Sequence, residues 1–284
     1  MKLSAKVKII IALVVVVLIL NWDTVSDMMK TGNVTGSAVV EPSYEEQTAP
    51  PNVYFCPADD CIGEMLAWLD AAEESIHCAL FEIGLEELRA KLLERSTEID
   101  VKVVTDNNYR DEVADLDFVR DDNRSALMHN KFCVLDGKAV WTGSYNPTSR
   151  GTHKNNNNVV FYQSWYLAQN YENEFAEMWG GKFGGGERTL YPETKINGNV
   201  VETYFCPEDW CSNKLIYALQ EASSSIYFMT FSFTHDEVGK RVLERHSSGV
   251  DVRGVFEKSQ NNDYTEFDKF LDAGIDVRWD GNPA

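Results

Sequence analysis

Positive charge is scarce in this sequence of 284 residues, which has 26 lysines and arginines against 45 aspartates and glutamates. The formal net charge of −19 repels polyanions, so a nucleic acid or an anionic membrane surface could bind only at a locally basic cleft. Apolar residues, by contrast, make up 44% of the chain. This content is enough for a packed core over most of the length.

Long apolar runs are also few, and the longest, Ile9–Leu20, lies near the N-terminus directly after a lysine-rich start. The run is shorter than the roughly 17–25 apolar residues of a typical spanning helix. No small-x-small cleavage site follows directly, which favours a retained signal anchor at residues 1–22 over a cleaved signal peptide. The lysines would stay on the cytoplasmic side, so we expect a membrane-anchored, extracytoplasmic protein that contacts the membrane through this N-terminal helix.

Residues 23–52 are poor in aromatic side chains and rich in small, polar and acidic ones. Such a segment cannot bury enough apolar surface to fold by itself. We therefore predict a flexible linker between the anchor and the folded domain.

The six cysteines fit an oxidising compartment. Four of them form two Cys-x4-Cys pairs in matching Cys-Pro contexts: Cys56 with Cys61, and Cys206 with Cys211. A local disulfide within each pair is favoured over a zinc site shared by all four cysteines and over free thiols. Cys78 and Cys133 lie inside apolar, strand-like runs, where a buried free thiol is the expected state.

An internal repeat divides the chain. Tyr54–Pro57 matches Tyr204–Pro207 at an offset of 150, and the same offset aligns Leu93–Arg95 with Leu243–Arg245. In the first copy, helical patterns alternate with strand-like runs: a helix around 65–72, a strand at 75–81, a helix at 85–95 and a strand at 100–105. This alternation predicts an α/β fold. We expect one repeat at 53–190 and a second at 191–284.

Residues with catalytic chemistry gather between positions 129 and 146. His129 and Lys131 would share one face of a strand, and Ser144 and Asn146 one face of the next, because side chains alternate along a strand. A hairpin would bring these four together around a phosphate diester. Asp136 lies on the opposite face from Lys131, so it would orient its surroundings rather than touch substrate.

The spacing His-x-Lys-x4-Asp followed by Gly-Ser-x-Asn resembles the signature of the phospholipase D superfamily. The resemblance covers residues 53–284 and implies a duplicated phospholipase D-like α/β sandwich that cleaves phosphodiesters without a metal or cofactor. It implies that His129 attacks phosphorus to form a phosphohistidine, that Lys131 binds the phosphate, and that Asn146 with Ser144 donates supporting hydrogen bonds. The resemblance thus implies that His129, Lys131 and Asn146 bind substrate, and it implies a catalytic set of five motif residues: His129, Lys131, Asp136, Ser144 and Asn146.

This sequence departs from the family pattern in two ways. Family members often have an acidic residue where Asn155–Asn158 stands. Aligning Asp117–Arg120 with Ile275–Arg278, an offset of 158, places the second motif's histidine near position 287, past the last residue given. The second repeat is therefore expected to be incomplete, and neither His235 nor His246 is followed by the required lysine.

Three functions remain open on the sequence. Phospholipid hydrolysis is favoured by the predicted anchor beside a bilayer, while a nuclease of the same superfamily is disfavoured by the acidic charge. A silent fragment that at most binds other molecules is the third, because half of the acid/base pair is missing. The incomplete second repeat would occupy the space beside the first, so a monomer is favoured over a dimer.

Overall fold

The computed structural model describes residues 44–281. The predicted anchor at 1–22 and most of the predicted linker lie outside this part of the chain. Among the described residues, no helix has the length and apolar character needed to cross a bilayer. Residues from Tyr44 onward form one compact unit, and the description below concerns this unit.

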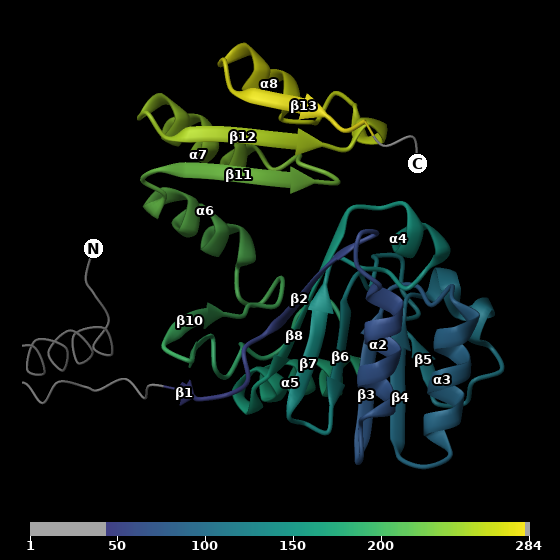
Figure 1. Ribbon diagram of the computed structural model, residues 1–284. Coiled ribbons are helices and arrows are strands. Elements are labelled where there is room, and N and C mark those ends of the chain that lie inside the picture. Colours follow the sequence, from purple (N-terminus) through teal and green to yellow (C-terminus); the bar gives the residue numbers. More distant parts are fainter. Residues whose placement is uncertain (1–43, 282–284) are drawn as a thin grey trace, which may run out of the picture. The chain divides into compact units, whose positions relative to one another are not determined.

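A seven-stranded mixed sheet forms the first half (Figure 1). Its strands, in spatial order, are β2 (Asn52–Cys56), β8 (Asn157–Gln163), β7 (Ala139–Gly143), β6 (Lys131–Leu135), β3 (Ser75–Leu80), β4 (Asp100–Thr105) and β5 (Val119–Asp121). The strands β3, β4 and β5 run parallel, whereas β6 pairs antiparallel with both β3 and β7. The predicted α/β fold is confirmed.

Helices cover both faces of this sheet, as the alternation of apolar side chains requires. On one face α2 (Cys61–Asp70) and α3 (Glu86–Ser96) pack in a core that includes Met65, Leu88 and Cys133. On the other face α5 (Trp165–Trp179) packs on the neighbouring β6 residues Phe132 and Val134. The connections contain η1 (Asn107–Val113) and α4 (Ser149–His153). These elements hold the two ends of β6 at fixed places.

The predicted linker is too long at its C-terminal end. Strand β1 (Tyr44–Glu46) pairs with β9 (Glu193–Ile196), which pairs in turn with β10 (Asn199–Glu202). The Glu46 carboxylate accepts hydrogen bonds from Ser164 Oγ and from the first backbone N–H groups of α5, a favourable place for an anion. Composition could not predict this, because the contacts are made with residues more than 100 positions away.

A three-stranded parallel sheet forms the second half, in the order β11 (Ser225–Thr230), β12 (Asp251–Phe256) and β13 (Asp276–Trp279). Its helices are α6 (Cys211–Glu221), α7 (Asp236–Ser247) and α8 (Phe267–Asp272), and a short η2 (Lys258–Gln260) follows β12. The core of this half contains Val242, Val252 and Phe270. The order strand, helix, parallel strand thus recurs from the first half.

Individual contacts also recur at the predicted offset of 150. Asp59 accepts a hydrogen bond from the backbone N–H of Phe55, and Asp209 accepts one from Phe205. Arg95 donates to the backbone oxygen of Ala72, and Arg245 donates to that of Ala222. The aligned residues therefore make the same local contacts in both halves. Residues 193–205, however, pack with the first half, through Ile196, Val201 and Phe205 against the core beside α5.

The two predicted disulfides are confirmed, Cys56–Cys61 and Cys206–Cys211. The expectation of free thiols at Cys78 and Cys133 is wrong, because these residues form a third disulfide. They lie directly opposite each other on the antiparallel strands β3 and β6, with Cα atoms 4.0 Å apart. Strand register, which the sequence did not reveal, is what brings two cysteines 55 positions apart into reach.

Candidate active site

The β6–β7 hairpin places the predicted residues at one end of the sheet. Phe132 pairs with Thr142, so the residues just before β6 and those just after β7 meet at the same end. His129 precedes β6 and Lys131 begins it, whereas Ser144 and Asn146 follow β7. The predicted hairpin is therefore present, with its turn at Asp136 and Gly137, both of which have positive φ.

Glycine is required where β7 ends. Gly143 has a φ of +154°, and a Cβ there would lie 2.2 Å from the backbone oxygen of Asn158. Any other residue would push β8 away from the segment that carries Ser144. The glycine of the Gly-Ser-x-Asn motif thus has a packing role in this fold.

His129 is exposed and packs edge-on against Phe81, with ring centroids 4.6 Å apart. Partial burial of the ring and the nearby charge of Lys131 lower the pKa of His129 below its ordinary value. The imidazole is therefore mostly neutral at neutral pH. A neutral ring has the free lone pair that a nucleophile needs.

The Lys131 side chain also lies against the Phe81 ring. Its ammonium lies 5.1 Å from the centroid of Phe81 and donates a 2.9 Å hydrogen bond to the backbone oxygen of His129. Burial lowers the pKa of Lys131 to about 8, although the charge of Glu82 acts in the opposite direction. The side chain still carries its charge at neutral pH, beside the histidine, where it could bind a phosphate oxygen.

Ser144 is held by the asparagine-rich segment. Its hydroxyl donates to Asn157 Oδ1 at 3.2 Å and accepts from the backbone N–H of Asn158 at 3.0 Å. An amide thus stands where the family often has a carboxylate, and it orients Ser144. Asn146 differs, because its Oδ1 is buried and has no hydrogen-bond partner among residues 44–281. Buried unpaired polar atoms are uncommon, so this oxygen is a candidate contact for a bound group.

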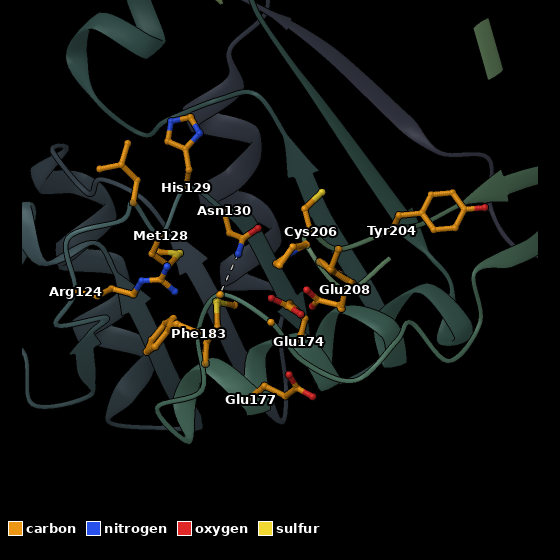
Figure 2. A pocket seen from close by; sticks show the side chains of 16 residues that line it. Arg124, Met128, His129, Asn130, Glu174, Glu177, Phe183, Tyr204, Cys206 and Glu208 are labelled. Atoms are coloured by element: carbon orange, nitrogen blue, oxygen red, sulfur yellow. Dashed lines mark hydrogen bonds between the residues drawn. The ribbon is translucent and has the colours of Figure 1, made fainter. Parts of the chain in front are cut away.

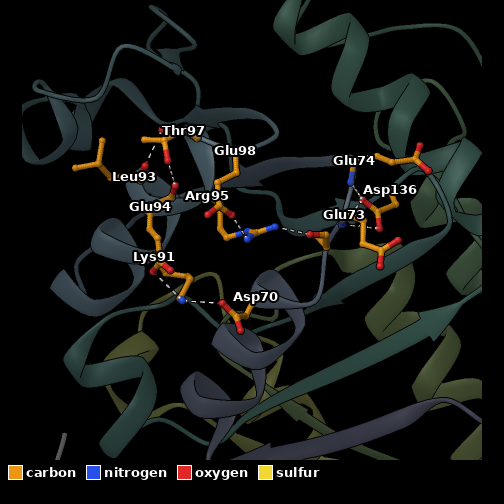
Figure 3. Close-up of polar contacts among 12 residues, drawn as sticks. Asp70, Glu73, Glu74, Lys91, Leu93, Glu94, Arg95, Thr97, Glu98 and Asp136 are labelled. Atoms are coloured by element: carbon orange, nitrogen blue, oxygen red, sulfur yellow. Dashed lines mark hydrogen bonds and ion pairs between the residues drawn. The ribbon is translucent and has the colours of Figure 1, made fainter.

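Asp136 does not lie with the other motif residues. It follows the far end of β6, and its carboxylate accepts hydrogen bonds of 2.7–3.1 Å from the backbone N–H groups of Glu73, Glu74 and Ser75 (Figure 3). Burial acts to raise the pKa of Asp136, but these three donors outweigh it and hold the pKa below its ordinary value. Its inclusion among the catalytic residues is therefore corrected, and its role is to fix the turn that precedes β3.

No second His-x-Lys pair occurs in the described residues. His235 caps α7, where its Nδ1 accepts a 3.4 Å hydrogen bond from the backbone N–H of Val238. His246 lies in the last turn of the same helix. Both histidines therefore belong to α7 and its N-cap.

A cavity of about 510 Å³, which no sequence pattern indicated, begins at His129 and Asn130. Its remaining walls include Arg124, the α5 residues Glu174 and Glu177, and the loop from Tyr204 to Glu208. Figure 2 shows His129 at one end and the carboxylates of Glu174 and Glu208 together at another. No spacing pattern could have indicated this cavity, because its walls come from segments far apart in the chain.

Comparisons with known proteins agree with this geometry. Residues 65–179 match the family model described as "Cardiolipin synthase, PLD-like domain". The mitochondrial cardiolipin hydrolase of Xenopus tropicalis is 33% identical over a segment that covers 44% of this chain and 65% of that protein. Its counterpart in Xenopus laevis is 30% identical, with 48% and 70% covered. The chain thus spans about two thirds of the length of these relatives.

Among solved structures, the phosphatidylserine synthase of Haemophilus influenzae has a similar fold, with a TM-score of 0.56 at 11% identity over 81% of this chain and 73% of that one. Together with the matches to the PLD-like family model and to the cardiolipin hydrolases, the His-x-Lys and Gly-Ser-x-Asn segments at one end of a hairpin define a phospholipase D-like phosphodiesterase. The chain belongs to the phospholipase D superfamily.

Proposed function

We propose that the protein hydrolyses phospholipid phosphodiester bonds through a phosphohistidine formed on His129. The observation that carries the proposal is the pairing of an accessible, neutral imidazole with the charged ammonium of Lys131 at one end of β6. The relatives named as cardiolipin hydrolases support a phospholipid substrate.

In the first step the His129 nitrogen attacks phosphorus, so that a P–N bond forms and the P–O bond to the leaving alcohol breaks. Lys131 stabilises the charge that develops on the phosphoryl oxygens, and Asn146 is placed to hold one of them. The departing alkoxide takes a proton from a general acid, and water then breaks the P–N bond. In the superfamily pattern a second histidine is that acid, and residues 44–281 contain no second His-x-Lys pair to supply it.

Two further parts of the proposal concern architecture. The matching contacts at an offset of 150 support an origin of the two halves by duplication. The basic and apolar N-terminus supports attachment to a membrane with the enzyme on the extracytoplasmic side.

The test is hydrolysis of labelled phosphatidylcholine, cardiolipin and single-stranded DNA by the full chain and by His129→Asn. Formation of labelled phosphatidic acid from either lipid, lost in the variant, is the expected result. Cleavage of DNA alone would favour the nuclease. Binding of lipid without turnover by either protein would instead favour the silent binding module.

A further inference from the structure

One role in the proposed mechanism has no residue assigned to it, that of the acid which protonates the departing alkoxide. Two polar groups near His129 already have hydrogen-bond acceptors, because the Lys131 ammonium donates to the backbone oxygen of His129 and the Ser144 hydroxyl donates to Asn157. The missing acid must be protonated at the pH where His129 is neutral, and its proton must not be held by another protein group. Tyr109, in η1 after β4, meets both conditions.

The Tyr109 ring packs on the same side chain as the two motif residues. Phe81, which directly follows β3, lies edge-on to His129 with ring centroids 4.6 Å apart and edge-on to Tyr109 with centroids 5.0 Å apart. The Lys131 ammonium is 5.1 Å from the centroid of the same ring. Phe81 is itself held in place, because its backbone N–H donates a 3.0 Å hydrogen bond to the backbone oxygen of Asn130. Tyr109, His129 and Lys131 therefore surround one fixed ring.

A buried carboxylate also connects Tyr109 with the histidine. Asp106 is fully buried and caps η1, the short helix that contains Tyr109. One of its oxygens accepts a 3.0 Å hydrogen bond from the backbone N–H of Asn108, the residue before Tyr109. The other accepts a 2.9 Å hydrogen bond from the backbone N–H of Met128, the residue before His129. The position of Tyr109 relative to His129 is thus fixed twice, by packing on one ring and by hydrogen bonds to one carboxylate.

The Tyr109 hydroxyl keeps its proton available. The side chain is half-buried, and its hydroxyl makes no hydrogen bond within residues 44–281. Burial and the nearby charges of Glu82, Asp106 and Glu112 raise the pKa of Tyr109 above its ordinary value of about 10. The phenol therefore stays protonated over the whole pH range in which His129 is neutral and able to attack. A phenol is still a stronger acid than an alcohol, so proton transfer from it to an alkoxide is favourable.

We propose that Tyr109 is the catalytic residue that donates a proton to the leaving alcohol. The proposal rests on the proposed function for the attack by His129. As the bond from His129 to phosphorus forms and the P–O bond to the alcohol breaks, the departing oxygen takes the Tyr109 proton. The phenolate then takes a proton from the attacking water, whose oxygen bonds to phosphorus while the P–N bond breaks and its electron pair returns to His129. Both side chains end in the protonation state in which they began.

The test uses two lipids that differ only in the leaving group, phosphatidylcholine and phosphatidyl-p-nitrophenol, in the same detergent micelles. The full chain and Tyr109→Phe, which removes the hydroxyl and keeps the ring, are compared by the rate of leaving-group release in the first turnover. We expect release of choline to fall at least about 100-fold in the variant, and release of nitrophenolate to stay within about threefold, because nitrophenolate leaves without a proton. A merely structural role for Tyr109 would slow both substrates alike.

The matched control is Tyr166→Phe, which removes the hydroxyl of another half-buried tyrosine, packed on Tyr44 in the first turn of α5. Both rates should be unchanged in the control. Equal losses on the two lipids in Tyr109→Phe, or no loss on either, would overturn the proposal and leave the attack by His129 standing. Release of nitrophenolate but not of choline by the wild type would also overturn it, because the chain would then hold a nucleophile without an acid. Release of neither leaving group by the wild type would contradict the proposed function, and the role of Tyr109 with it.

Discussion

His129 and Lys131 act on each other through charge. The ammonium of Lys131 favours the neutral form of His129, and partial burial lowers the pKa of both groups. Between the two pKa values the histidine is neutral while the lysine is charged, which is the combination that nucleophilic attack on a phosphate diester requires. The motif therefore defines a working pH range as well as a geometry.

We predict a bell-shaped pH profile for kcat/KM on a phosphodiester. The rate should rise as His129 loses its proton, at a pH below the ordinary histidine value of about 6.5, and fall as the pH passes about 8 and Lys131 loses its charge. In Lys131→Arg the alkaline fall should disappear up to pH 9, because a guanidinium stays protonated there. An unchanged alkaline limb in this variant would show that another group controls it.

His77 links the sheet to α5. Its Nδ1 lies 2.5 Å from Glu172 and its Nε2 lies 3.2 Å from Asp100, while the ring stacks on Phe175 at 4.9 Å. Burial acts to lower the pKa of His77, but the two carboxylates outweigh it and raise the pKa above its ordinary value. A proton on this ring therefore stabilises the folded state.

The stability that this proton contributes should be complete below about pH 6.5 and be lost as the pH rises through the raised pKa of the folded state. We predict that His77→Gln lowers the free energy of unfolding by about 1 kcal/mol more at pH 6 than at pH 9. Urea titrations at the two pH values measure this difference. A cost that is independent of pH would mean that packing on Phe175 is the whole contribution.

The spacing of the motif predicted which residues meet at the end of the hairpin, because a period of two and a short turn fix the geometry. It did not predict Phe81, Glu174 or Glu208, which reach the site from other elements. Their places depend on how β3, α5 and the loop before α6 pack together. Tertiary packing of this kind leaves no local pattern in the sequence.

The third disulfide joins β3 to β6, the strand that begins at Lys131, in the centre of the large sheet. Cys78 and Cys133 are 55 positions apart, whereas Cys56 and Cys61 are 5 positions apart. Closing the longer loop restricts the unfolded chain more than closing the shorter one does. The bond between Cys78 and Cys133 should therefore contribute more to stability than the bond between Cys56 and Cys61.

We predict that Cys78→Ala/Cys133→Ala lowers the free energy of unfolding by roughly 4 kcal/mol, against roughly 2 kcal/mol for Cys56→Ala/Cys61→Ala, if loop entropy dominates. Urea titrations of the two double variants under non-reducing conditions supply the comparison. Equal losses would show that native packing around the sulfur atoms, rather than loop length, determines the contribution.

The helices and strands predicted in the first repeat agree with α2, β3, α3 and β4 to within a few residues. The apolar periodicity and the internal repeat together predicted these helices and strands. The strand β1 was missed because three residues carry no recognisable period. It exists through its pairing with β9 and the hydrogen bonds of Glu46 to the start of α5.

In the mechanism proposed for the whole chain, the nucleophile and the general acid are different groups. The first half supplies His129 and Lys131, whereas no second His-x-Lys pair occurs in residues 44–281. Cleavage of a natural lipid needs that acid, because an alkoxide is a poor leaving group. An aryl diester such as bis(p-nitrophenyl) phosphate does not need it, because nitrophenolate leaves as a stable anion. Attack by His129 can thus be measured separately from protonation of the leaving group.

Stopped-flow release of nitrophenolate, combined with intact-protein mass spectrometry, measures whether His129 forms the proposed covalent bond to phosphorus. We predict a burst approaching one equivalent per chain and an added nitrophenyl phosphoryl mass that maps to His129. Both should be absent in His129→Asn, with thermal unfolding unchanged because the side chain is exposed. A burst of the same size in the variant, or an adduct on another residue, would contradict the claim.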